Sequence, residues 1–186
     1  VARDAARGLL TDAIDDDERS ALLYELYAAG KQHSLDPSTL DGFVREALPR
    51  AESALWAPMA ARLRGARDSN LALWAKGHEA LAEFTKDETL ATAHLAAAAR
   101  VHVRAGDLDA ARALLERALS LSPGHAYATA LLEEVLRRKG EPEEVVRLLR
   151  ASAESIAGEK IAERNLLSAG ASAEQGGNTD LAAELY

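Results

Sequence analysis

The sequence predicts an all-α protein built from antiparallel helix pairs, and three observations lead to this fold class. The 186 residues include 41 alanines but only 7 valines and 3 isoleucines, and alanine favours helices whereas β-branched residues favour strands. Aromatic residues make up only 4% of the chain, so leucine and alanine must build the core, and small side chains let helices approach closely. Glycine-containing turns recur at nearly constant spacing, which is typical of stacked helical repeats.

In the N-terminal half, the apolar pattern predicts degenerate helix pairs. Leu22, Leu23, Leu26 and Tyr27 make one apolar face at helical spacing. The Asp36-Pro37 step separates the two helices of one pair. The first segment of the chain is expected to be the second helix of a pair whose other helix is missing. The expected helices cover residues 1–14, 18–33, 38–48, 51–64 and 69–85.

Three turns divide the C-terminal half. They contain Gly106, Gly140 and Gly177, which lie 34 and then 37 residues apart. Glycine suits the left-handed position that ends a helix, and the side chains of Asp107 and Asn178 suit the cap that begins the next helix. Each unit is therefore predicted to consist of a helix, a turn and a second helix. The clearest unit has its helices at residues 92–104 and 108–121.

This arrangement resembles the roughly 34-residue pattern of the tetratricopeptide-repeat family. The family places large apolar residues early in the first helix, glycine at the turn, alanine in the second helix and proline near the end. In residues 92–125 the matches are Leu95, Ala98, Ala99, Gly106, Ala111, Leu115, Ala118 and Pro123. In residues 126–159 they are Leu132, Leu136, Gly140, Val145 and Leu149, and in residues 163–186 they are Leu166, Ala169, Gly170, Gly177, Ala182 and Tyr186.

The resemblance implies a right-handed α-solenoid, a superhelix of about ten or eleven helices in antiparallel pairs. We expect a single repeat domain over residues 1–186, with degenerate repeats in 1–91, clearer repeats in 92–125 and 126–159, and a truncated one in 163–186. Because the chain begins with valine and stops within its last expected helix, we expect a fragment of a longer protein. The excess of arginine over lysine, 17 to 5, favours a GC-rich bacterial genome.

Composition excludes several classes of partner. The formal net charge of −8 disfavours nucleic acid, because that binding depends on neutralising phosphates. No apolar run approaches the roughly 20 residues that span a bilayer. The chain has no cysteine, so it has neither a thiol nucleophile nor a thiolate metal site. We expect no nucleic-acid or membrane partner and a cytoplasmic location, and self-association stays an open alternative.

No motif indicates catalysis or metal binding. The acidic run at residues 15–18 lacks the alternating oxygen ligands of a calcium loop and suits a helix N-terminus. His94 and His102 lie eight residues apart, whereas a two-histidine zinc motif needs about four. No phosphate loop, dinucleotide fingerprint or nucleophile elbow is present. We therefore expect no enzyme activity, no metal and no cofactor, and we expect Trp56 and Trp74 to be core anchors.

The resemblance also implies a concave groove that is lined by the first helices of the repeats and takes a peptide or helix of a partner protein. Arginine is frequent at the corresponding positions, and its planar guanidinium can bind carboxylates through two hydrogen bonds. The alternative is that these arginines only solvate a helix face and pair with nearby glutamates. The family's clamp for chaperone tails uses lysine and asparagine where this chain has Ala96, Arg100 and Leu131, so we expect no binding of such tails. The candidate groove residues are Arg100, Arg104, Tyr127, Glu134, Arg137, Arg138 and Arg164.

The sequence thus favours a protein–protein interaction scaffold, whose partner could present an acidic peptide segment to the groove. A second hypothesis is a sensor or regulatory helical segment of a larger transcription regulator or signalling enzyme. In that case the active domain would lie outside this sequence.

Overall fold

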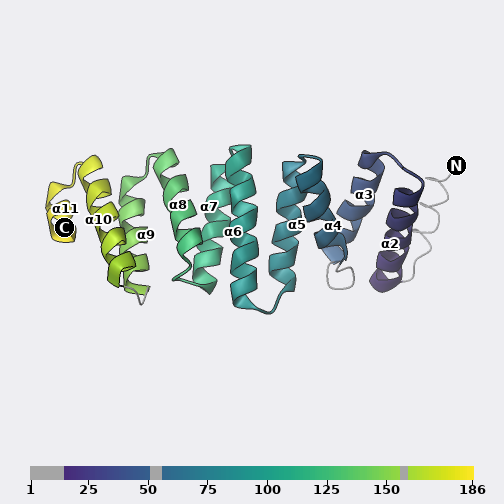
Figure 1. The fold of residues 1–186 in the computed structure, drawn as a ribbon, viewed down its shortest axis with the longest axis horizontal. Helices are drawn as coiled ribbons and strands as arrows, with labels where there is room; N and C mark the ends of the chain where they lie inside the picture. The colour runs from purple at the N-terminus through teal and green to yellow at the C-terminus, as the bar shows by residue number, and fades with distance from the viewer. Residues whose placement is uncertain (1–14, 51–55, 156–158) are drawn as a thin grey trace. The chain divides into compact units, whose positions relative to one another are not determined.

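The computed structural model describes residues 15–50, 56–155 and 159–186, and all regular structure in these ranges is helical. They contain ten α-helices and one 3-10 turn, and no strand occurs among them (Figure 1). The predicted all-α class is therefore confirmed. The helix expected at residues 1–14, and the start of the one expected at 51–64, lie outside the described residues.

The chain divides into two compact units, residues 1–86 and residues 87–186, and within each unit consecutive helices pack against each other as in a helical-repeat solenoid. The single domain expected over residues 1–186 stays a prediction. In the first unit the helices are α2 (Asp16–Gln32), α3 (Pro37–Ala47), α4 (Trp56–Arg67) and α5 (Leu71–Phe84), with a 3-10 turn, η1, at Leu48–Arg50. In the second unit they are α6 (Glu88–Ala105), α7 (Leu108–Leu121), α8 (Ala126–Lys139), α9 (Pro142–Ser155), α10 (Glu159–Gln175) and α11 (Thr179–Leu185).

Seven of the ten described helices begin at a capping side chain, among them the caps at Asp107 and Asn178 that the sequence predicted. Asp15 Oδ1 accepts a hydrogen bond from the backbone N–H of Glu18 at 2.8 Å, so the acidic run 15–18 is a helix start. Asp107 caps α7 in the same way through the N–H of Ala110 at 3.1 Å. These bonds satisfy N–H groups that have no partner within the helix.

The three turn glycines occupy equivalent places. Gly106, Gly140 and Gly177 have φ angles of 81°, 73° and 80°, a left-handed conformation that glycine adopts without a Cβ penalty. Each follows the first helix of a pair and precedes the second. The repeat spacing read from the sequence therefore corresponds to a repeated backbone turn.

In the first unit, α4 and α5 cross with their backbones in close contact. A Cβ atom added at Gly77 would lie 2.4 Å from the backbone nitrogen of Arg62, and one added at Gly65 would lie 2.3 Å from that of Trp74. Only glycine leaves room for this approach. Beside the crossing, the buried guanidinium of Arg64 donates to Asp41 Oδ1 at 2.6 Å, which links α4 to α3.

Aromatic side chains join α2 to α4 in the same unit. The ring centroid of Trp56 lies 5.6 Å from that of Tyr24 and 5.3 Å from that of Tyr27. Trp56 is partly buried and packs against the buried side chains of Leu23 and Ala57. It therefore anchors the core of this unit, as expected, and Trp74 packs its backbone against Gly65.

In the second unit, most of the apolar residues that carry the repeat resemblance lie in the core, whereas Tyr186 is 60% exposed. The pattern residues of α6 and α7 are fully buried. Val145, which stands at the alanine position of the repeat in α9, is buried as well. One boundary differs from the prediction, since α6 begins at Glu88 and not near Thr92. The cause is Asp87, whose carboxylate accepts from the N–H of Leu90 at 3.0 Å and starts the helix earlier. The buried pattern residues are Leu95, Ala98, Ala99, Ala111, Leu115 and Ala118.

Candidate binding groove

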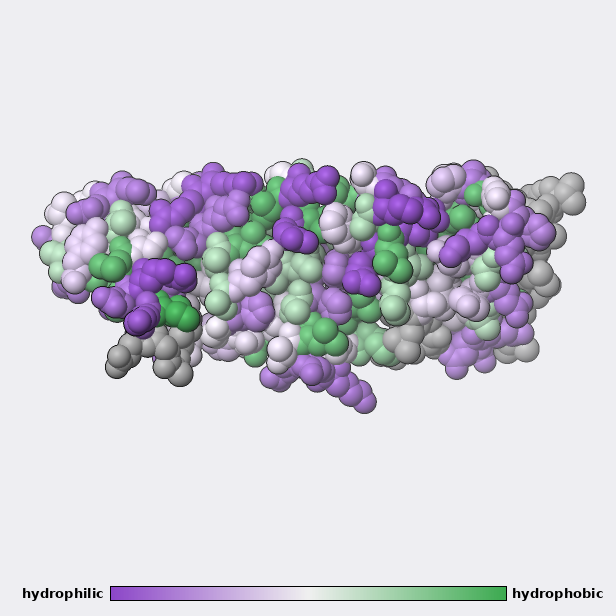
Figure 2. All heavy atoms as spheres, viewed as in Figure 1, coloured by the Kyte–Doolittle hydropathy of each residue, from purple (hydrophilic) through white to green (hydrophobic). Residues whose placement is uncertain are grey.

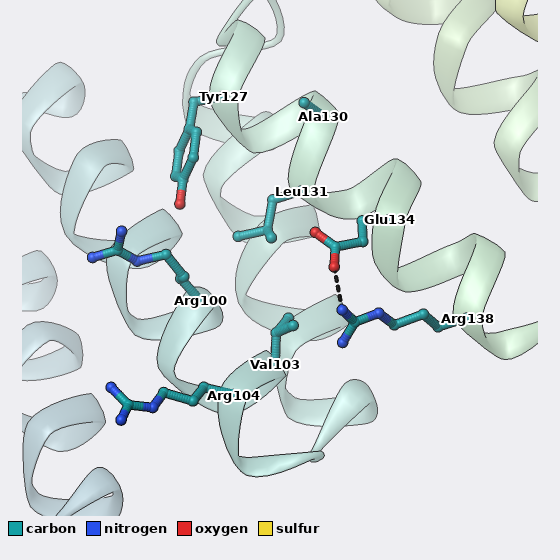
Figure 3. A pocket seen from close by; sticks show the side chains of 8 residues that line it. All are labelled: Arg100, Val103, Arg104, Tyr127, Ala130, Leu131, Glu134 and Arg138. Carbon is teal, nitrogen blue, oxygen red and sulfur yellow. Dashed lines mark ion pairs between the residues drawn. The ribbon is translucent and has the colours of Figure 1, made fainter. Parts of the chain in front are cut away.

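A groove of about 390 Å³ runs between α6 and α8 in the second unit. Its side chains come from these two helices alone, because α6 and α8 are the first helices of successive pairs and lie in contact. Figure 3 shows the arrangement from close by. The lining residues are Arg100, Val103 and Arg104 of α6, and Tyr127, Ala130, Leu131, Glu134 and Arg138 of α8.

Helical periodicity places these residues on one face of each helix. Steps of three and four residues return to the same side of an α-helix, so Arg100, Val103 and Arg104 project together from α6. On α8 the same steps align Tyr127 with the other lining residues. Helix geometry therefore lets a short stretch of each helix build the groove.

The floor of the groove is apolar. Leu131 is only 7% exposed and Val103 is half-buried, and Figure 3 shows both at the centre of the site. Tyr127 stands at one end with 47% of its surface exposed, and its hydroxyl points toward the side of Arg100. A partner could bury an apolar side chain here and still reach polar groups at the edge.

The arginine side chains along the edge of the groove differ in whether they have an ion-pair partner. Arg138 forms an ion pair with Glu134 one helical turn earlier, drawn as a dashed line in Figure 3. Arg100 and Arg104 are exposed, and among the described residues neither has an ion-pair or hydrogen-bond partner. Both guanidinium groups extend to the same side of the groove. That side therefore carries two uncompensated positive charges on a protein with a net charge of −8.

A family model described as tetratricopeptide repeat matches residues 102–163, from the end of α6 to the start of α10. Over these residues the chain is similar to tetratricopeptide repeats. No curated protein matches the sequence. Repeats of this kind stack into extended surfaces that bind other proteins, so the match suggests a general role in protein–protein interaction.

Among the seven candidate groove residues, Arg137 lies outside the groove. It is directed from α8 toward α10, where it donates to Ser172 Oγ at 2.8 Å and Gln175 Oε1 at 3.4 Å. It also pairs with Glu133 at 2.9 Å, and Glu133 accepts from Ser168 at 3.0 Å. Arg137 therefore links one helix pair to the next. The sequence could not show this, because the partners lie more than thirty residues away.

Arg164 lies at a different place again. It lines a small hollow of about 20 Å³ with residues of α8 and α9, and its guanidinium donates to Asn165 Oδ1 at 3.4 Å. The structure thus brings together Arg100, Arg104, Tyr127, Glu134 and Arg138 of the candidate set, and it places Arg137 and Arg164 elsewhere.

Hydrophilic side chains cover much of the visible face over α8 to α11, with smaller hydrophobic patches among them (Figure 2). Within the described ranges, no group of three histidine, cysteine, aspartate or glutamate side chains is placed to hold a metal ion. In the same ranges, no helix is both long enough and apolar enough to cross a membrane.

Proposed function

We propose that this chain is an interaction module that binds an acidic peptide segment of a partner protein in the groove between α6 and α8. The observation that carries the proposal is the pair Arg100 and Arg104. Their guanidinium groups lie beside an apolar floor and have no ion-pair or hydrogen-bond partner among the residues that the structure describes. A peptide carboxylate would satisfy them, and an apolar side chain next to it would cover Val103 and Leu131.

The ion pair between Glu134 and Arg138 makes the two sides of the groove differ in how strongly they attract a carboxylate. Because Glu134 already neutralises Arg138, an incoming carboxylate gains less there than beside Arg100 and Arg104. Glu134 also repels a carboxylate that comes close. The acidic part of the ligand therefore belongs on the α6 side, with its apolar part toward α8.

The expected affinity is modest. Exposed charge contacts contribute roughly 0.2–1 kcal/mol each, so two arginines alone hold a peptide weakly. With Tyr127 and the apolar floor added, a dissociation constant of about 1 µM, or about −8 kcal/mol, is within reach. Binding should weaken as salt rises, because mobile ions screen exposed charges.

The test begins with random peptides displayed on phage and selected on the wild-type protein. Selected peptides are then titrated against an Arg100→Glu, Arg104→Glu double variant at low and high salt. We expect acidic peptides that bind the double variant at least about tenfold more weakly and with less salt dependence. The matched control is Arg45→Glu with Lys76→Glu, which changes the charge equally at exposed residues of the first unit.

Two results would contradict the proposal. One is a set of selected peptides without acidic residues. The other is equal binding of acidic peptides to the groove variant and to the control variant while both remain folded. Equal binding includes an equal loss in both variants, because net charge alone, and not the groove, would then attract the peptides.

A further inference from the structure

Charged side chains fill the junction between α7, α8 and α9. Arg112 of α7 pairs with Glu141 at 2.6 Å and lies 3.9 Å from Glu144, both from the start of α9. Lys139, at the end of α8, pairs with Asp109 of α7 at 2.6 Å. A hydrogen bond to Glu116 raises the pKa of Arg112, and a hydrogen bond to Asp109 raises the pKa of Lys139, so the network stays charged. It occupies the space where one repeat meets the next.

The following junction, between α9, α10 and α11, has the same backbone turns but different side chains. Gly106, Gly140 and Gly177 define equivalent positions, because all three adopt the same left-handed conformation. Counted from these glycines, four of the five members of the network are replaced by uncharged residues, and the fifth, Asp109, corresponds to Glu143, which is also acidic. The replacements are Val146 for Arg112, Gly176 for Lys139, Asn178 for Glu141 and Leu181 for Glu144.

These replacements coincide with an open hollow of about 410 Å³. All four replacing residues line it, as does Ala173 of α10. Val146 is 4% exposed and Ala173 is 3% exposed, so both present an apolar floor at the bottom of the hollow. Pockets that hold ligands usually measure about 300–1,000 Å³, and this hollow falls within that range.

A positively charged side chain lies beside the apolar floor of the hollow. Arg150 lines the hollow and is exposed, and it has no ion-pair or hydrogen-bond partner among the residues that the structure describes. It holds the position that Glu116 has in the preceding junction, ten residues after the turn glycine. Its neighbour Arg147 pairs with Glu144. Glu143 also lines the hollow and lies seven residues before Arg150 on α9, so about two helical turns separate the acidic side chain from Arg150.

We propose that this hollow is a second peptide-binding site, which takes a segment that carries an apolar side chain next to a single acidic residue. The apolar side chain would cover Val146 and Ala173, and the carboxylate would pair with Arg150. Glu143 would repel a second carboxylate about two helical turns from Arg150, so the acidic residue belongs on one side only. The site uses α9, α10 and α11 and shares no lining residue with the α6–α8 groove.

The preceding junction supplies the design of the test. A Val146→Arg, Leu181→Glu double variant introduces the Arg112 and Glu144 arrangement into the hollow and should fill it. An Arg150→Glu variant removes the cation without touching the floor, and because Arg150 is exposed it should leave the fold intact. Random peptides displayed on phage are selected on the wild-type protein and titrated against both variants and against the Arg100→Glu, Arg104→Glu variant.

We expect one class of peptides with an apolar residue beside a single acidic residue. These peptides should lose at least about tenfold in affinity in both hollow variants and keep their affinity in the groove variant. The inference is overturned if no such class is selected, or if its peptides bind the Arg150→Glu variant as tightly as the wild type. If peptides respond to the groove variant alone, the proposed function stands and the second site does not exist.

Discussion

At the scale of single residues, Ala111 shows how little space the repeat leaves where two helices cross. It is fully buried, whereas Ala113 on the same helix is exposed. We predict that Ala111→Leu lowers the free energy of unfolding by about 1–3 kcal/mol, because added methyl groups in a packed core force neighbours apart. Ala113→Leu is the control and should change it by less than about 0.5 kcal/mol. Urea unfolding of both variants measures the difference, and equal midpoints would contradict the repeat register.

Asp36 makes the first unit sensitive to acid. Its carboxylate accepts from Ser38 Oγ at 2.5 Å, from the N–H of Thr39 at 2.9 Å and from Thr39 Oγ1 at 2.6 Å. These hydrogen bonds hold the pKa of Asp36 well below its usual range. The folded state therefore favours the charged carboxylate. Its contribution to stability is complete above the unfolded-state pKa of about 3.9 and is lost as the pH falls toward the folded-state pKa.

We predict that Asp36→Asn reduces the loss of stability in acid. The amide still caps α3 but does not titrate, so the difference in unfolding free energy between wild type and variant should shrink as the pH falls from about 5 to about 2. Urea unfolding at several pH values measures this difference. A difference that stays constant over the whole range would show that Asp36 does not titrate with folding.

At the scale of elements, the crossing of α4 and α5 reverses an ordinary rule. Replacing glycine by alanine within a helix usually stabilises a protein by about 0.5–1 kcal/mol. At Gly77 the new methyl group would meet the backbone of Arg62, which cannot move without separating the helices. We predict that Gly77→Ala destabilises the protein by about 1–3 kcal/mol.

Gly42 provides the matched control within the same unit. It lies in α3, and a Cβ added there would meet nothing within 4 Å. Gly42→Ala should therefore stabilise the protein by the usual amount of about 0.5–1 kcal/mol. Thermal unfolding of the two variants should shift in opposite directions. A stabilised Gly77→Ala variant would mean that the two helices do not approach as closely as described.

The helices and turns were predictable because their signals are local. Asp107 lies directly before the helix that it caps, and Gly106 adopts the left-handed conformation that ends the preceding helix. The apolar pattern places the start of α6 near Thr92, four residues after its first residue, Glu88, because the cap at Asp87 lies outside that pattern. Local chemistry therefore predicts element types well and boundaries less well.

The candidate site was harder to predict, because it depends on pairing between repeats. Arg100 and Arg137 look alike in the sequence, yet Arg137 is held by serine and glutamine side chains of α10 while Arg100 has no described partner. The hollow beside Arg150 also depends on pairing between repeats. Comparing Arg112 with Val146 at equivalent positions would have indicated it, since a change from charge to apolar at a junction removes a filling side chain.

At the scale of the molecule, the division after Lys86 defines two units that each have their own buried core. We predict that residues 87–186 fold on their own, because α6 to α11 pack mainly on one another and α6 has its own cap at Asp87. Circular dichroism of the isolated segment should show a helical spectrum and a cooperative melt. An unfolded segment would mean that it requires residues of the first unit.

The packing of each helix on its neighbours in sequence also sets the order in which the second unit can assemble during synthesis. Its main contacts join α6 to α7, α7 to α8 and so on to α11. Most contacting residues are therefore close to each other in the sequence. Proteins with such local contacts fold quickly, and domains generally begin to fold while the ribosome is still adding residues. The pair α6 and α7 can therefore form first, and each later helix then adds to a surface that already exists.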